Sequence, residues 1–190
     1  MSDSAQCVLA AASDPGPGLS ELLHAVARHD RSALESLYQT CRQGIFAVAL
    51  SVTRDRQLAE DVLQDTMLYL WAHADAYRRD GHPKAWMLTI ARHLAMDLMR
   101  KNHRTVLLES WDEVPGSAGM TLPADMVSDL ELSMAISKLA PAEAQVLILF
   151  SFAGLSHGET AKLLGIPYYK VRYRYRRAIG KLRVLLSVDE

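Results

Sequence analysis

The sequence has few cysteines and no long run of apolar residues, and both absences narrow what the protein can be. Its 190 residues include only two cysteines, Cys7 and Cys41. Two are too few for a disulfide framework or a zinc site and are typical of a reducing cytosol. The longest apolar runs, such as residues 45–50, fall far short of the roughly 20 residues that cross a bilayer. The first residues also lack the charged start and apolar stretch of a signal peptide. We therefore expect a soluble, cytoplasmic protein without membrane insertion.

Motifs of catalysis and of tightly held cofactors are also missing. The sequence contains no G-x-x-x-x-G-K-[ST] or G-x-G-x-x-G phosphate loop, no G-x-S-x-G nucleophile elbow and no H-E-x-x-H zinc helix. Its seven histidines are scattered. His93 and Asp97 have the i, i+4 spacing of a metal pair, but their basic surroundings would repel a cation. We predict no enzyme active site, no cofactor and no bound metal.

Positive and negative charges are segregated along the sequence, although the net charge of the chain is only −1. Residues 1–77 and 105–165 carry net charges of −5 and −6, whereas residues 78–104 and 166–190 each carry +5. No acidic residue occurs from Ile166 to Arg183. This segregation predicts contact with nucleic acid in two places, and contact with a protein partner or a second copy elsewhere.

Helical periodicity recurs along most of the chain and predicts an all-α protein of two small domains. The hydrophobic content of 49% is enough for one or two helical domains. Residues 1–18 and 105–127 lack periodicity and gather Pro, Gly and acidic residues, so we expect a disordered tail and a flexible linker there. The predicted domains are residues 19–104 and 128–190. In the first domain we expect one helix that ends near His29, a second that runs through Ala49, and two more at 56–77 and 84–102. In the second domain we expect a helix at 130–139 and another that begins at Pro141.

Residues 155–183 have the pattern of a helix-turn-helix. Ser156 and Glu159 form an S-x-x-E capping box, Gly165 ends the short helix, and Pro167 restarts the chain. An apolar stripe on the second helix is expected to pack inward: Val171, Tyr175, Ala178, Leu182 and Leu185. The opposite face is expected to read base edges through Tyr169, Arg172, Tyr173 and Arg176, flanked by cations for phosphates at Lys170, Arg174, Arg177 and Lys181. A solvated basic helix is the alternative, but such helices normally mix charges of both signs.

The helix predicted at 56–77 carries an unusual stripe on its exposed side. Asp61, Gln64, Asp65 and Leu68 follow one another at i, i+3, i+4 and i+7, which places them on one helix face. The stripe combines two carboxylates, an amide and an apolar side chain. By composition alone a solvated helix face is the better interpretation, so the stripe does not indicate a function by itself.

The helix predicted at 84–102 combines an apolar face with an excess of cations. An ion pair between Asp97 and Lys101, at i+4, would neutralise one of these cations. Ion pairs within the segment cannot neutralise the remaining cations. A second nucleic-acid surface is therefore expected in residues 78–104. Trp86 could stack on an unpaired base, although a tryptophan in an apolar stripe is more often a core residue.

Taken in this order, the motifs resemble the small bacterial sigma factors of the extracytoplasmic-function (ECF) group of the sigma-70 family, over roughly residues 22–186. Residues 59–74 resemble the polymerase-binding helix of that family, and its D-x-x-Q-[DE] positions fall on Asp61, Gln64 and Asp65. Residues 84–104 are similar to the segment that melts and reads the minus-ten element, and residues 140–178 follow the domain that binds the minus-thirty-five element. Within residues 84–104 the candidate DNA contacts are Lys84, Trp86, Arg92, His93, Asp97, Arg100, Lys101 and Arg104.

The resemblance implies a sigma factor that binds RNA polymerase core enzyme and promoter DNA without catalysis of its own. It also implies control by an anti-sigma factor that covers these faces, with Leu68 and Met96 as candidate anchors. The chain departs from the family where a small Gly-Thr pair is replaced by Tyr169 and Lys170, and where a small polar residue is replaced by Tyr173. The resemblance therefore does not give the preferred promoter sequence.

Two other interpretations fit part of the sequence. The first is an ordinary helix-turn-helix regulator whose N-terminal half dimerises or senses a ligand, which leaves the basic residues 78–104 unexplained. The second is a helical interaction module whose basic C-terminal helix meets an acidic partner or a membrane surface. That module predicts no dependence on a promoter.

Overall fold

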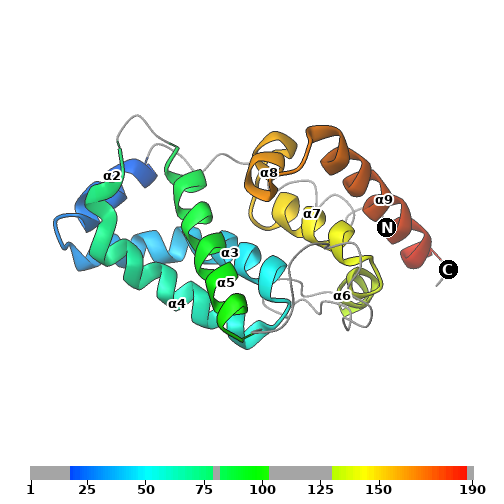
Figure 1. Ribbon diagram of the computed structural model, residues 1–190, viewed down its shortest axis with the longest axis horizontal. Helices are drawn as coiled ribbons and strands as arrows, with labels where there is room; N and C mark the ends of the chain where they lie inside the picture. The colour runs from blue at the N-terminus through cyan, green and yellow to red at the C-terminus, as the bar shows by residue number, and fades with distance from the viewer. Residues whose placement is uncertain (1–17, 79–81, 103–129, 188–190) are drawn as a thin grey trace. The chain divides into compact units, whose positions relative to one another are not determined.

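The structure is a computed structural model that describes residues 18–78, 82–102 and 130–187 (Figure 1). The chain divides into two compact units, Met1–His103 and Arg104–Glu190. All the regular structure in the described residues is helical, so the all-α prediction is confirmed. Arg104, the tail at residues 1–17 and the linker at 105–127 lie outside the described residues, and the predictions for them stay predictions.

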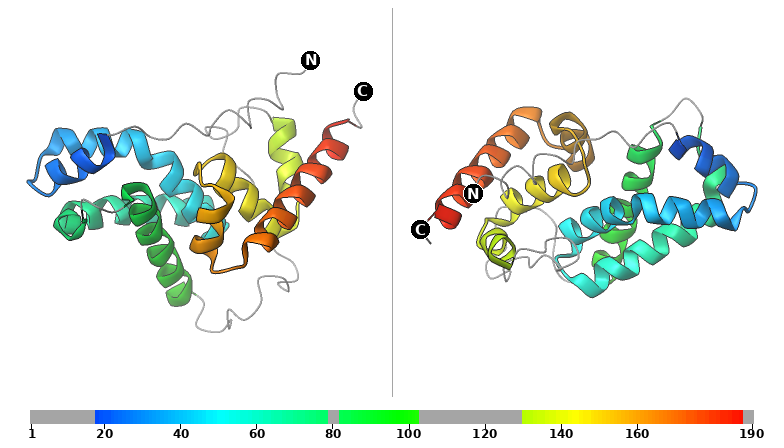
Figure 2. Two further views of the ribbon diagram at one scale, coloured as in Figure 1. Left: turned by 90° about the horizontal axis from the view of Figure 1, so that it is seen from above. Right: turned by 180° about the vertical axis from the view of Figure 1, so that it is seen from behind.

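The first unit is built around one long central helix. It contains α2 (Gly18–Val26), α3 (Arg31–Thr53), α4 (Arg56–His73), the short 3-10 helix η1 (Ala74–Ala76) and α5 (Pro83–Asn102). Helix α3 packs against α2, α4 and α5, and Figure 2 shows it lying alongside α4. This central position explains why every residue from Ile45 to Thr53 is buried. Most of them are apolar, and the hydroxyls of Ser51 and Thr53 donate to the carbonyls of Val48 and Ala49.

Local capping fixes the ends of α3 and the start of α4. The carboxylate of Asp30 accepts hydrogen bonds from the backbone N–H groups of Ser32 (2.9 Å) and Ala33 (3.2 Å). At the other end Arg54 adopts the left-handed conformation, with φ of 55°, and reverses the chain. Asp55 then accepts a hydrogen bond from the N–H of Leu58 at 2.9 Å. A polar side chain therefore satisfies backbone N–H groups at the start of each of these two helices.

Several predicted boundaries need small corrections. The helix predicted at 84–102 begins at Pro83, and the one predicted at 130–139 ends at Ser137. The first described helix begins at Gly18, a residue that the prediction assigned to the tail. The helix predicted at 56–77 ends its α-helical part at His73 and continues as η1, because the N–H of Tyr77 bonds to the carbonyl of Ala74, three residues back, at 3.2 Å.

The second unit is a helix-turn-helix supported by two further helices. It contains α6 (Leu130–Ser137), α7 (Pro141–Ser151), α8 (His157–Leu164) and α9 (Tyr168–Ser187). Helix α7 supplies more buried residues than any other helix of this unit, because its residues from Glu143 to Leu149 are all buried. Helix α9 packs on α6, α7 and α8. Among the described residues, no helix is long and apolar enough to cross a membrane.

Candidate polymerase and nucleic-acid interfaces

The stripe predicted on α4 lies on the solvent side of that helix. Asp61, Gln64 and Asp65 are exposed, and the side chain of Leu68 is 66% exposed. The opposite side of α4 is fixed by burial of Val62, Thr66 and Leu70, among others. Fully buried Thr66 satisfies its hydroxyl by donating to the carbonyl of Val62 at 2.7 Å. The rigid packing of one side therefore presents two carboxylates, an amide and an isobutyl group together on the other.

Aromatic side chains extend the exposed surface of α4 toward its C-terminal end. The ring of Tyr69, 38% exposed, stacks on the ring of His73 with their centroids 4.3 Å apart. The exposed leucine and this stacked pair give the surface an apolar contribution that a purely solvated face does not need. Such a mixture of carboxylate, amide and apolar groups is suited to a protein partner.

Helix α5 buries its apolar side and exposes Arg100 and Lys101. Its fully or almost fully buried residues are Met87, Leu88, Ala91 and Ala95. Lys101 and His93 are exposed, whereas Lys84 is half-buried. Arg92 is also half-buried, and burial lowers the pKa of its guanidinium. Because arginine is the most basic side chain and is not deprotonated in proteins, this group still carries its charge at neutral pH.

Two side chains of α5, Asp97 and Trp86, make contacts that the sequence did not predict. Asp97 pairs with Arg100, which donates from Nη1 to Oδ1 at 2.8 Å, instead of with Lys101 as the i+4 spacing suggested. Trp86 is half-buried and packs on Tyr77, with ring centroids 5.4 Å apart. The tryptophan thus has a structural contact and is not fully buried.

The turn of the helix-turn-helix forms as its sequence predicts. The hydroxyl of Ser156 accepts a hydrogen bond from the N–H of Glu159 at 3.2 Å, and the Glu159 carboxylate accepts one from the N–H of Ser156 at 2.8 Å. Gly165 ends α8 with φ of 68°, in the left-handed region that glycine occupies without strain. The capping box and the left-handed glycine fix the start of α9 relative to α8.

Helix α9 separates a packed side from an exposed side as predicted. Val171, Ala178 and Leu182 are buried. Tyr175 is half-buried, with its ring 4.8 Å from the rings of both Phe150 and His157. On the other side Tyr169 is 67% exposed and Tyr173 is 58% exposed. The remaining exposed side chains of that face include Lys170, Arg172 and Arg176, whereas Arg174 is half-buried.

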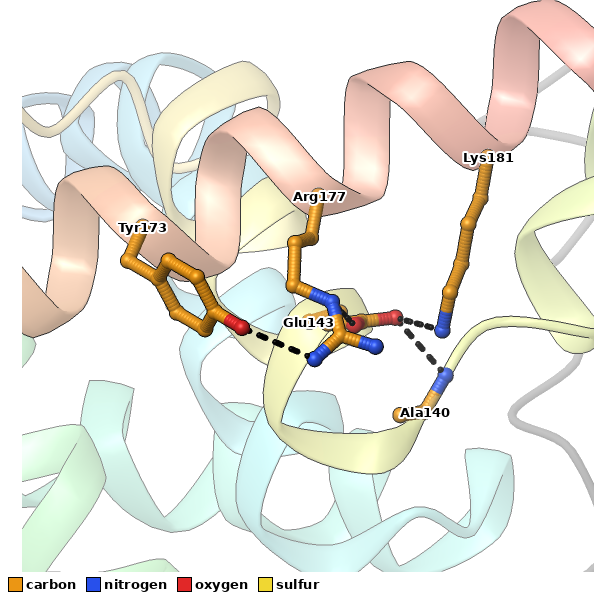
Figure 3. Close-up of polar contacts among 5 residues, drawn as sticks. All are labelled: Ala140, Glu143, Tyr173, Arg177 and Lys181. Atoms are coloured by element: carbon orange, nitrogen blue, oxygen red, sulfur yellow. Dashed lines mark hydrogen bonds and ion pairs between the residues drawn. The ribbon is translucent and has the colours of Figure 1, made fainter.

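Two of the predicted phosphate-binding cations have a partner inside the protein, which the sequence interpretation missed. Arg177 Nε lies 3.1 Å from Oε1 of Glu143, and Lys181 Nζ lies 2.7 Å from Oε2 (Figure 3). The Glu143 side chain is only 5% exposed, whereas those of Arg177 and Lys181 are 51% and 41% exposed. Glu143 stands three residues after the helix cap, a position typical of a capping glutamate. That local signal could have singled it out, but its contact with α9 is not local.

No other chemistry competes with these surfaces in the part of the chain that the structure describes. No group of three or more His, Cys, Asp or Glu residues there could hold a metal ion. Cys41 is buried, and burial raises the pKa of its thiol to about 11. It therefore carries almost no reactive thiolate at neutral pH.

Comparison with known proteins matches both units. Residues 37–105 match the family model of sigma-70 region 2, and residues 129–182 match that of sigma-70 region 4. The ECF RNA polymerase sigma factor EcfG of Rhodopseudomonas palustris is 32% identical over 149 residues, which cover 76% of this chain and 78% of that protein. The ECF RNA polymerase sigma factor SigK of Mycobacterium tuberculosis is 27% identical over 184 residues, or 90% of this chain and 95% of the relative.

Two solved structures have a similar arrangement of helices. One is CnrH in complex with the cytosolic domain of CnrY, with a TM-score of 0.59 and 23% identity, covering 90% of this chain and 98% of that one. The other is the sigma factor RpoE in complex with the anti-sigma factor NepR from Bartonella quintana, with a TM-score of 0.57 and 28% identity. That match covers 82% of this chain and 98% of the RpoE chain.

Proposed function

The chain belongs to the ECF RNA polymerase sigma factors of the sigma-70 family, and from that premise we propose which of its surfaces carries each step of transcription initiation. As a sigma factor it binds RNA polymerase core enzyme and directs it to promoter DNA. The family match does not favour the alternative of an ordinary helix-turn-helix regulator with a dimerising or sensing half. The observation that carries the proposal is the order of matches: region 2 over the exposed α4 stripe and basic α5, then region 4 over the helix-turn-helix.

The α4 stripe is the proposed contact with core polymerase. Its support is the exposure of Asp61, Gln64, Asp65 and Leu68 on a helix whose other side is packed. Exposed carboxylates on a helix face add only a few tenths of a kcal/mol to folding. The stripe is therefore more easily explained by binding than by stability, and it is the surface on which a holoenzyme would assemble.

Helix α5 is the proposed contact with the opened minus-ten element. Cations on its exposed side attract the backbone of a single strand, and Trp86, which is only half-buried, is proposed to stack on an unpaired base. Asp97 is proposed to orient Arg100 for this contact, through their ion pair at 2.8 Å. The other proposed contacts here are Lys84, Arg92, His93, Lys101 and Arg104.

Helix α9 is the proposed reader of the minus-thirty-five element in the major groove. The exposed side chains of Tyr169, Arg172, Tyr173 and Arg176 are suited to base edges, since guanidinium and phenol groups supply directed donors. Lys170 and Arg174 would hold flanking phosphates. Arg177 and Lys181 are half-exposed and already contact Glu143, so they are proposed to hold the helix in place as well as to lend it positive charge.

Control by an anti-sigma factor is the proposed regulatory step. The similar RpoE of Bartonella quintana was solved in complex with the anti-sigma factor NepR. In this chain the exposed Leu68 lies on the same α4 face as Asp61 and Asp65, and Met96 lies half-buried on α5. An inhibitor anchored on these apolar groups would compete with core polymerase for one surface. The sequence places no sensing site in the chain, so we propose that the inducing signal acts on the partner.

The proposal needs no catalytic residue in this chain, because polymerase performs the chemistry, and it places the protein in the cytoplasm. Transcription of sheared genomic DNA by purified core polymerase, with and without this protein, tests it. New RNA 5′ ends that share an upstream sequence and require the protein are the expected result. An unchanged set of 5′ ends would reject promoter recognition and favour an interaction module.

A further inference from the structure

Glu143 is a charged side chain held inside the second unit by three contacts. Its Oε2 accepts hydrogen bonds from Lys181 Nζ at 2.7 Å and from the backbone N–H of Ala140 at 3.3 Å. Its Oε1 lies 3.1 Å from Nε of Arg177, and all three contacts are drawn in Figure 3. A carboxylate that is 5% exposed is stable only while its partners remain in place. The contacts therefore fix the orientation of Glu143 and of the groups that it binds.

Arg177 passes this constraint on to the exposed face of α9. While Nε contacts Glu143, Nη1 donates a hydrogen bond to the phenol oxygen of Tyr173 at 3.0 Å (Figure 3). The guanidinium carbon also lies 5.6 Å from the centroid of the Tyr173 ring. The hydrogen bond to Tyr173 and the charge of Glu143 both raise the pKa of Arg177. A continuous chain of contacts thus runs from the core to an exposed aromatic side chain.

The direction of the hydrogen bond between Arg177 and Tyr173 determines whether the Tyr173 hydroxyl donates or accepts a hydrogen bond toward DNA. A guanidinium has only donors, so the phenol oxygen must be the acceptor. The single O–H proton of Tyr173 is not used in this contact. A phenol without such a partner can donate or accept with equal ease, whereas this one is biased toward donation.

Because the argument concerns promoter choice, it rests on the proposed function. We propose that Glu143 is a positioning residue for base recognition: it holds Arg177, which makes the Tyr173 hydroxyl a hydrogen-bond donor to the upstream promoter element. In the major groove guanine presents two acceptors and thymine presents one, whereas cytosine presents an amino donor. Adenine also presents one acceptor, N7, beside its amino donor. The base that faces Tyr173 is therefore guanine, thymine or adenine, and cytosine is excluded because two donors would meet.

Lys181 provides a matched control within the same cluster. It binds the same carboxylate as Arg177, but it follows Tyr173 by eight residues, about two helical turns along α9. Replacing it disturbs the Glu143 ion pair without breaking the contact between Arg177 and Tyr173. An effect on base preference that depends on positioning should therefore appear in Glu143→Gln and not in Lys181→Met.

The experiment uses core polymerase with the full-length chain and a pool of duplex promoters randomised over the upstream element. Sequencing the bound or transcribed fraction gives the preference at each position. The wild-type chain should select against cytosine, relative to guanine, by roughly three- to tenfold at one position, the range for one hydrogen bond. Tyr173→Phe, on an exposed side chain, should erase that discrimination. Glu143→Gln should reduce it at least about twofold at that position alone, and Lys181→Met should preserve the pattern even if total binding falls.

Each contrary outcome has a distinct meaning. Equal discrimination against cytosine in wild type and Tyr173→Phe would overturn the assignment of the donor. A Glu143→Gln chain that is folded by circular dichroism and has the wild-type preference would overturn the positioning role. A wild-type chain that enriches no upstream position would reject the proposed function itself, and this proposal with it.

Discussion

The ion pair between Glu143 and Lys181 should stabilise the second unit measurably, although one partner is half-exposed. Exposed pairs contribute roughly 0.2–1 kcal/mol, whereas breaking a fully buried pair costs about 3–5 kcal/mol. Glu143 is 5% exposed and Lys181 is 41% exposed, so this pair falls between the two limits and must be discounted for screening at the lysine. We expect Glu143→Gln to destabilise the unit by about 1–2 kcal/mol, and the coupling with Lys181→Met to be about 1 kcal/mol.

Calorimetry of the full-length chain, with hydrogen exchange to assign the transitions to α7 and α9, measures both quantities. For a domain of this size a loss of 1 kcal/mol lowers Tm by roughly 4–8 °C. The unit should therefore melt about 4–15 °C lower in Glu143→Gln. High salt should shrink the difference, because about 1 M salt reduces the screening length to roughly 3 Å.

The pair between Arg56 and Glu60 is the matched control for this cycle. Its atoms are 2.8 Å apart, close to the 2.7 Å between Lys181 and Glu143, but its side chains are 58% and 51% exposed, so the coupling should be only about 0.3–0.5 kcal/mol. The reasoning would be refuted by a coupling between Glu143 and Lys181 that is no larger than that of this surface pair. Burial of the carboxylate would then have no energetic consequence.

Three further predictions concern the other surfaces. Asp61→Arg and Asp65→Arg should abolish co-purification with core polymerase while Tm stays nearly unchanged, and wild-type binding would mean that the stripe is merely solvated. Arg100→Ala should form closed complexes that open poorly, so normal permanganate reactivity near the start site would contradict the role of α5. Burial, and then Arg172, lower the pKa of His157. The unfolded chain therefore takes up the proton first, and the stability of the second unit should fall as pH drops below about 6.5; a pH-independent difference from His157→Phe would refute this.

Most of the fold follows from local signals in the sequence. The Ser156 capping box and the left-handed Gly165 act within a few residues, so they can be read without knowing the tertiary structure. The same holds for the exposed faces of α4 and α9, because helical periodicity alone separates them from the buried stripes. These are the positions at which sequence and structure agree.

The remaining differences arise where the outcome depends on distant or competing contacts. Glu143 meets Lys181 across 38 positions of sequence, a distance over which periodicity carries no information. Asp97 has cations at both i+3 and i+4, and spacing alone does not say that it pairs with Arg100. Similarly, Trp86 is half-buried because Tyr77 lies against it, which no pattern within α5 could predict.

The central claim is that separate faces of this chain serve separate steps of transcription initiation. Mapping RNA 5′ ends produced on genomic DNA by core polymerase with wild type, Asp61→Arg, Arg100→Ala or Arg172→Ala tests it most directly. Asp61→Arg should yield no specific 5′ ends, and Arg100→Ala should yield the wild-type set at reduced level. Arg172→Ala should yield a different set with a relaxed upstream sequence, since a bidentate arginine contact is worth about 1–3 kcal/mol of discrimination. Wild-type 5′ ends at wild-type level from all three variants, or the same loss in all three, would contradict the account.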